Sequence, residues 1–266
     1  MNTEEKILFC WEFFQKLHHN LSQKELQQFV PEAEHLGTPP ENKNFTQETK
    51  EHKKWSFFYL EKAWKYVPML RFLPGVRAVA VCNSVAMGTA TEDSDIDLLI
   101  ITDSKKLWTA RVFCTIFFHL LGLRRHGKKI AGRFCLSFFI TESAMNFERI
   151  ALLPRDPYLA FWISTLHPIF GRDVFLRLAE KNRNFVKKNA GIPLLFLEKI
   201  REEPKKRPFF QRFLEKIFEK QWEYVLKKIF LPRAIRKKRK LKDDSGIILS
   251  EHILKFHNSD KRKEFL

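Results

Sequence analysis

The stretch that decides the fold is Asn83-Ser84-Val85-Ala86-Met87-Gly88-Thr89-Ala90-Thr91-Glu92-Asp93-Ser94-Asp95-Ile96-Asp97-Leu98-Leu99-Ile100. It leads from one apolar run, through a turn of small residues, to two carboxylates that open a second apolar run. Residues two apart in a strand leave the same face of the sheet, so Asp95 and Asp97 are expected side by side. Such carboxylates raise each other's pKa unless a cation lies between them. Because Mg²⁺ prefers oxygen ligands and completes its shell with phosphate oxygens and water, the stretch predicts metal-dependent chemistry on a phosphate.

Paired acids on a strand are also typical of a solvated sheet edge, and three features argue against that reading. Apart from Asp97, the residues from Ile96 to Ile101 are apolar, which predicts a buried strand where a bare charge is unfavourable. The Asn83-Ser84 turn precedes the acids by a dozen residues, enough for a short helix and a return. Gly88 lies between, where the backbone can pass close to a ligand.

With these residues in place, the segment resembles the nucleotidyltransferase superfamily related to DNA polymerase β, especially its small prokaryotic members. The family pattern is a Gly-Ser turn, a short helix, and Asp-x-Asp on the next strand. Here Asn83-Ser84 takes the Gly-Ser position and Ser94-Asp95-Ile96-Asp97 takes the strand. The resemblance covers about residues 74–102 closely and extends to about 141. Asn83 replaces the usual Gly, and Asn tolerates left-handed backbone conformations better than most residues.

The resemblance implies which residues carry the chemistry. Ser84 and the backbone at Asn83 would contact the phosphates of a nucleoside triphosphate, while Asp95 and Asp97 would be catalytic and would bind Mg²⁺ or Mn²⁺. The implied reaction is in-line displacement at the α-phosphorus, which transfers a nucleoside monophosphate to an acceptor hydroxyl and releases pyrophosphate.

One expected feature of the family is missing from the next strand. Many members place a third carboxylate there, but the predicted strand Arg133–Thr141 carries Arg133, Cys135 and Ser137 on that face. The nearest substitute for this carboxylate is Glu142, just past the end of the strand, and two weaker candidates are Asp103 and Asp156. The alternative function is therefore a catalytically degenerate nucleotide-binding or RNA-binding protein on the same fold. A partner that modifies another protein is a third open hypothesis.

Composition bounds the class of protein. The chain has 266 residues with 44% hydrophobic and 14% aromatic residues, which indicates a folded protein with a large core. Its four cysteines are scattered without metal-ligand spacing, and Met1–Glu5 does not resemble a signal peptide, so a cytoplasmic protein is expected. The longest apolar segment, Leu107–Leu123, contains Arg111 and His119 and predicts a buried helix, so no transmembrane segment is expected.

Charge is distributed unevenly along the chain. The formal net charge is +17, and residues 181–266 carry 25 Lys and Arg against 11 Asp and Glu. A basic region of this kind attracts polyanions such as nucleic acid, nucleotides or acidic lipids, but it is equally typical of solvated helix faces. The densest run, residues 233–242, fits a solvated tail or a nucleic-acid grip.

Apolar periodicity and turn residues predict an α+β unit followed by a mainly helical C-terminal region. The resemblance implies that the α+β unit is a small mixed β-sheet nucleotidyltransferase core with flanking helices. The predicted units are an N-terminal helix and linker (1–52, with the linker at 31–52), the core (53–150), a helical domain (151–232) and a basic tail (233–266). The predicted helices are 6–17, 55–72, 84–90, 107–123, 157–170, 172–188, 193–202 and 209–230, and the predicted strands are 76–82, 95–102 and 133–141.

Overall fold

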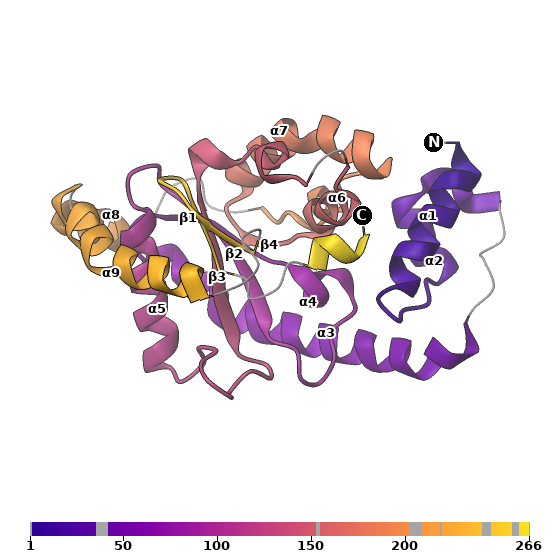
Figure 1. Cartoon of the computed structure of the whole chain (residues 1–266), viewed down its shortest axis with the longest axis horizontal. Coiled ribbons are helices and arrows are strands. Elements are labelled where there is room, and N and C mark those ends of the chain that lie inside the picture. The colour runs from indigo at the N-terminus through magenta and orange to yellow at the C-terminus, as the bar shows by residue number, and fades with distance from the viewer. Residues whose placement is uncertain are drawn as a thin grey trace.

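A single mixed sheet organises the molecule. The computed structural model describes residues 2–35, 42–152, 155–202, 209–218, 220–240, 246–256 and 261–265. Within them the sheet has six strands in the order β4-β1-β2-β3-β6-β5 (Figure 1). The strands are β1 (Val76–Val81), β2 (Ile96–Thr102), β3 (Phe134–Thr141), β4 (His167–Phe170), β5 (Ile247–Leu249) and β6 (Ile253–Phe256).

The three central strands are nearly continuous apolar runs. Strand β1 pairs antiparallel with β2, and β2 pairs parallel with β3. Both faces of these strands are buried, which explains why their sequences are apolar throughout rather than alternating. The β2–β3 register shifts between the pairs Asp97–Cys135 and Leu99–Phe138, so β3 carries one extra residue there. Such a bulge locally re-aims side chains, and it lies directly beside the two acids.

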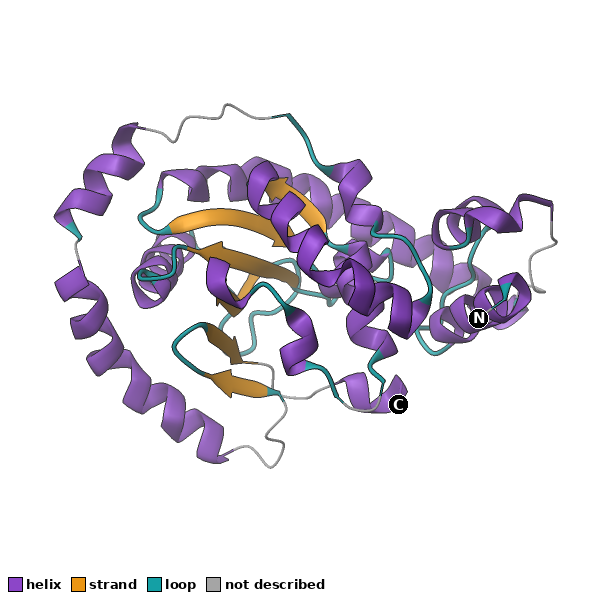
Figure 2. Ribbon diagram, turned by 90° about the horizontal axis from the view of Figure 1, so that it is seen from above, coloured by secondary structure: helices purple, strands orange, loops and turns teal. Residues whose placement is uncertain are grey.

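Helices cover both faces of the sheet. The side chains of α6 and α7 form one core cluster with Ala78, Leu99 and Ile140, whereas those of α3 and α5 form another with Val79 and Ile100. Figure 2 shows the helices around the strands, with α8 and α9 along one outer end. The helices are α1 (Thr3–Gln15), α2 (Gln23–Phe29), α3 (Thr46–Tyr66), α4 (Asn83–Met87), α5 (Leu107–Leu120), α6 (Pro157–Thr165), α7 (Arg172–Ala190), α8 (Phe209–Ile217) and α9 (Lys220–Lys240).

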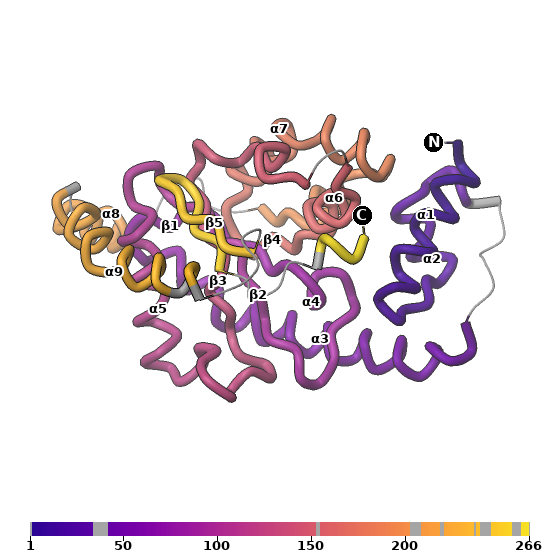
Figure 3. Tube along the Cα trace, viewed as in Figure 1, coloured from indigo at the N-terminus to yellow at the C-terminus, as the bar shows by residue number. Residues whose placement is uncertain are grey.

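The N-terminal helices pack against the middle of the chain through aromatic rings. Phe13 of α1 stacks on Phe161 of α6 with ring centroids 3.9 Å apart, and Phe265 near the C-terminus lies 4.8 Å from the Phe13 ring. Figure 3 shows the two ends of the chain on the same side of the molecule, with α1 and α2 beyond α6. The N-terminal segment is therefore joined to the rest by a Phe-rich core.

The predicted α+β class and the order of elements from 76 to 141 are confirmed, and several boundaries differ. The helix predicted at 157–170 ends at Thr165, and residues 167–170 form β4, which pairs antiparallel with β1. This strand lies at the sheet edge, where Pro168 is tolerated because the outer side needs no ladder hydrogen bond. The helix predicted at 193–202 is a 3-10 turn, and the one predicted at 209–230 is divided into α8 and α9.

Two segments expected to be irregular contain regular structure. Helix α2 was not predicted, and α3 begins at Thr46, inside the segment 31–52 that the sequence predicts to be a linker; residues 36–41 of that segment lie outside the described residues. The segment 233–266, expected as a basic tail, supplies the end of α9 and the strands β5 and β6. Residues 241 and 242 of the basic run lie outside the described residues, and the four-unit division of the chain stays a prediction.

Candidate active site

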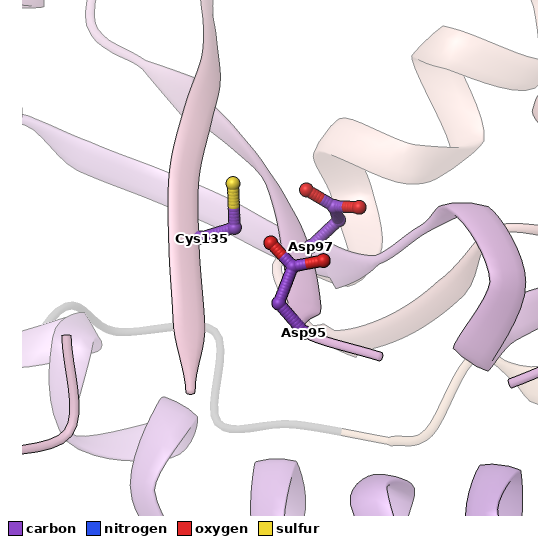
Figure 4. A group of neighbouring side chains, drawn as sticks. All are labelled: Asp95, Asp97 and Cys135. Carbon is purple, nitrogen blue, oxygen red and sulfur yellow. The ribbon is translucent and has the colours of Figure 1, made fainter. Parts of the chain in front are cut away.

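Two carboxylates and a thiol meet where β2 begins beside β3. Asp95 directly precedes β2, Asp97 is its second residue, and Cys135 is paired with Asp97 in the parallel register. One carboxylate oxygen of Asp95, one of Asp97 and the Cys135 sulfur all lie within 4.8 Å of one another, and Figure 4 shows the three side chains gathered together. The two-residue spacing thus places both acids on one side of the strand, as expected from the sequence.

The first residue of α4 holds Asp97 in position. Asn83 has a left-handed backbone with φ of 57°, which agrees with its place at a position where the family has Gly. Its side-chain amide nitrogen donates to Asp97 Oδ2 at 2.6 Å, and its Oδ1 accepts from Trp162 Nε1 at 2.7 Å. Asn83 therefore links the acid on β2 to helix α6. No sequence pattern pointed to Trp162, because its partner lies 79 residues earlier in the chain.

Burial and mutual repulsion make the acid pair electrostatically unfavourable. Burial raises the pKa of Asp97, and the nearby charge of Asp95 raises it further, while the Asn83 amide acts in the opposite direction. Asp95 is compensated differently, because Arg125 Nη1 lies 2.5 Å from its Oδ2. A guanidinium thus already occupies part of the space that a cation would take beside these oxygens.

The three substitutes considered for the missing carboxylate lie elsewhere. Glu142 pairs with Arg177 at 2.8 Å, and Asp103 pairs with Arg77 at 3.0 Å. Asp156 is fully buried, where it caps α6 and accepts from Arg262 Nη1 at 3.2 Å; none of the three acids is among the residues that line the cavity described below.

On β3, the strand where the resemblance implies a third acid, the residue paired with Asp97 is a cysteine. Burial and the two neighbouring aspartates hold the pKa of Cys135 above its ordinary value, so in the protein alone this thiol is neutral at physiological pH. Ser137 Oγ lies 3.5 Å from Asp97 Oδ1 on the same side of β3. The three-atom set therefore offers a divalent cation two carboxylates and one soft sulfur, which fits Mg²⁺ less well than Mn²⁺.

A large cavity opens over the acids. Its volume is about 1350 Å³. The four residues singled out from the sequence all line it: Asp95, Asp97, Asn83 and Ser84. Cationic side chains are gathered around the same cavity from the loop after α5, from α5 itself, from α9 and from β6: Arg111, Arg124, Arg125, Arg233 and Lys255. Charges of this sign suit a polyphosphate.

Among these cations, Arg111 is held mainly by structural contacts. Its Nη1 donates to the Leu136 carbonyl oxygen at 3.0 Å, and its guanidinium lies over the Phe256 ring at 4.2 Å. The sequence left open whether Arg111 reaches a phosphate or has a buried aliphatic chain with its guanidinium paired to an acid of the protein. In the structure it braces β3 and β6, and burial lowers its pKa to about 10.

Comparison with known families agrees with this geometry. A sequence model described as a nucleotidyltransferase domain matches residues 65–254, a range that contains the acids, the Asn83-Ser84 turn and most of the sheet. No curated protein and no solved structure matches the chain.

Proposed function

Because the chain belongs to the nucleotidyltransferase domain family, we propose that it transfers a nucleoside monophosphate from a nucleoside triphosphate to an acceptor hydroxyl, with a divalent cation bound at Asp95 and Asp97. The observation that carries the proposal is the position of both carboxylates, side by side in the wall of the cavity that the Asn83-Ser84 turn also lines.

The donor atoms fit a divalent cation. Asp95 and Asp97 would hold it, with Cys135 as a third donor, and Arg125 already stands in as a positive charge beside Asp95. When bound, Mg²⁺ or Mn²⁺ supplies charge neutralisation for the phosphates and for the oxygens that attack and leave. The two half-buried carboxylates repel each other, so binding of a cation would relieve an unfavourable interaction.

The chain's own residues bind and orient the triphosphate. The Asn83-Ser84 turn would contact phosphate through Ser84 Oγ and backbone N–H groups, and Arg124, Arg125 and Arg233 would compensate the negative charge of the polyphosphate. The acceptor oxygen attacks the α-phosphorus, the bond to the bridging oxygen breaks, and pyrophosphate leaves with that electron pair.

The proton of the acceptor hydroxyl needs a base. The Cys135 thiol is neutral in the protein alone, so it is not the base. An oxygen of each aspartate lies within 4.8 Å of its sulfur, and a carboxylate of this pair is the stronger proton acceptor. The buried cysteines are all free thiols, which supports a reducing compartment and hence the cytoplasm.

The test is turnover of each nucleoside triphosphate with Mg²⁺ or Mn²⁺, measured as pyrophosphate release and as transfer of labelled nucleotide. Asp95→Asn and Asp97→Asn variants should each lose activity by several orders of magnitude, because each removes a ligand of the cation. Asp103→Asn is the matched control, since this acid pairs with Arg77 and is not among the residues that line the cavity.

The replacement of the third acid by Cys135 favours one alternative, a nucleotide-binding protein without catalysis. Calorimetric titration with a non-hydrolysable triphosphate separates the two. Binding that depends on both acids, without turnover for any nucleotide or metal, would establish the non-catalytic function and overturn the transferase.

A further inference from the structure

Helix α8 is attached to the protein by its polar side. Gln211 is only 2% exposed, and its side-chain nitrogen donates to the carbonyl oxygens of Leu73 at 3.1 Å and Val76 at 2.7 Å. Glu215 accepts from the Gly75 amide at 3.2 Å, one turn further along the helix. The usual arrangement of a surface helix, with its apolar side inward and its polar side in water, is therefore inverted.

The opposite side of α8 is apolar and exposed. Phe209, Phe210, Phe213 and Ile217 are 76%, 55%, 50% and 49% exposed, and their spacing places them on one face of the helix. The start of α9 continues the exposure with Trp222 and Val225, which are 46% and 42% exposed. We call these six side chains the α8–α9 apolar surface.

Helix α9 is also fixed from one side, so its exposed residues are not explained by loose packing. Glu223 accepts from the backbone amides of Trp108 and Thr109 at the start of α5, each at 2.8 Å. Leu226 and Phe230 pack against the core on that same side. Figure 2 shows α8 and α9 as an arc along one outer end of the molecule, and the side chains of the α8–α9 apolar surface are 42% to 76% exposed.

The charge around the surface identifies what would cover it. Residues 209–240 contain eleven Lys and Arg against three Glu, and exposed cations flank the apolar side chains, among them Arg212, Lys216 and Lys228. A second copy of the chain would bring two strongly positive surfaces together, so the charge disfavours self-association here. The partner must be both anionic and able to bury phenyl and aliphatic groups.

We propose that the α8–α9 apolar surface docks on a membrane that contains anionic lipids. Phenylalanine, isoleucine and tryptophan side chains insert at the boundary of headgroups and acyl chains, while the flanking Lys and Arg contact the lipid phosphates. A nucleic acid would satisfy the cations but would leave Ile217 and Val225 without a complementary surface. In the described part of the chain no helix is long and apolar enough to cross a membrane, so the helices lie on the surface rather than span it.

The experiment is co-sedimentation of the full chain with vesicles, either of phosphatidylcholine alone or of phosphatidylcholine and phosphatidylglycerol in a three-to-one ratio. We expect binding to the anionic vesicles that weakens with added salt, and weak binding to the neutral ones. The paired substitution Phe213→Glu and Ile217→Glu should lower the partition coefficient by roughly a hundredfold, since each removes one inserting apolar group. Binding should also shift tryptophan emission to the blue, and Trp222→Phe should remove that shift.

Two controls keep the test specific. Leu8→Glu changes another exposed apolar side chain, 52% exposed, on α1 at the other end of the molecule, and it should bind vesicles as the wild type does (Figure 1). The unfolding temperature of the paired variant should equal that of the wild type, because the anchoring contacts of α8 come from Gln211 and Glu215.

Several results would overturn the proposal. They are absence of binding to anionic vesicles, unchanged binding by the paired variant, or equal loss of binding by Leu8→Glu. A dimer in sedimentation velocity that the paired substitution dissociates would assign the surface to a second copy. RNA binding that the same substitution abolishes, without vesicle binding, would assign it to nucleic acid.

Discussion

Replacing Asp97 by Asn should stabilise the protein in the absence of metal while it abolishes nucleotidyl transfer. Burial and the charge of Asp95 raise the pKa of Asp97 from 3.8 to about 6. In the unfolded chain this carboxyl ionises first, so folding loses stability as pH rises from 3.8 to about 6 and the full penalty is present above that range. A shift of this size corresponds to about 2 to 3 kcal/mol. Asparagine avoids the penalty and still offers an oxygen to the Asn83 amide.

The measurement is urea unfolding with a chelator present, at pH 8 and at pH 4. Asp97→Asn should gain about 2 kcal/mol over the wild type at pH 8 and much less at pH 4, where the wild-type carboxyl is protonated. Asp103→Asn is the control of opposite sign: Asp103 pairs with Arg77 at 3.0 Å, so its substitution should destabilise at pH 8. Added Mn²⁺ should stabilise the wild type and leave Asp97→Asn almost unchanged. An Asp97→Asn variant that is less stable than the wild type at pH 8 would refute the repulsion argument.

Three further predictions test other parts of the structure. Cys135→Asp supplies the oxygen ligand found in many family members, so the ratio of Mg²⁺ to Mn²⁺ affinity in calorimetric titration should rise by roughly tenfold. Burial lowers the pKa of His167 from 6.5 to about 4. The unfolded chain therefore takes up this proton first, and the free energy of unfolding decreases as pH drops from 6.5 to 4. In urea unfolding, His167→Gln should make this decrease smaller by at most roughly 3 kcal/mol. In thermal unfolding, Gly171→Ala should lower stability by about 2 to 4 kcal/mol, because φ is +98° and an added Cβ would meet Ala78 Cβ at 2.2 Å. Gly127→Ala is the control: φ is +54° but the space around it is open, so this variant should lose only about 1 kcal/mol.

The sequence was sufficient for the part of the fold that is decided locally. Between Val76 and Thr141 the apolar runs are long, and the turns between them contain small or charged residues, so each strand and helix could be predicted at nearly its observed position. The side-by-side acids follow from the period of a strand alone. The left-handed backbone at Asn83 likewise fits the tolerance of that residue type.

The parts that escaped prediction depend on contacts between distant residues. Strands β4, β5 and β6 are three or four residues long. They are strands because β4 pairs with the edge of β1, β6 pairs with the edge of β3, and β5 pairs in turn with β6. Short apolar segments such as 167–170 do not distinguish a strand from the end of a helix. The inverted attachment of α8 could not be foreseen either, because it depends on carbonyl groups at Leu73 and Val76, about 140 residues earlier in the chain.

The same distinction explains why the site needs the whole fold. The two-residue spacing brings Asp95 and Asp97 together, but the groups that stabilise their charges come from other parts of the fold. Arg125 comes from the loop before β3, and the Asn83 amide comes from the turn after β1. Each group stabilises one carboxylate without neutralising the pair, since the pKa of Asp97 stays raised. A divalent cation that displaces Arg125 from Asp95 would neutralise both acids at once and release the guanidinium toward the cavity, where a triphosphate carries the matching charge. The unfavourable acid pair is thus what couples metal binding to nucleotide binding in the proposed function.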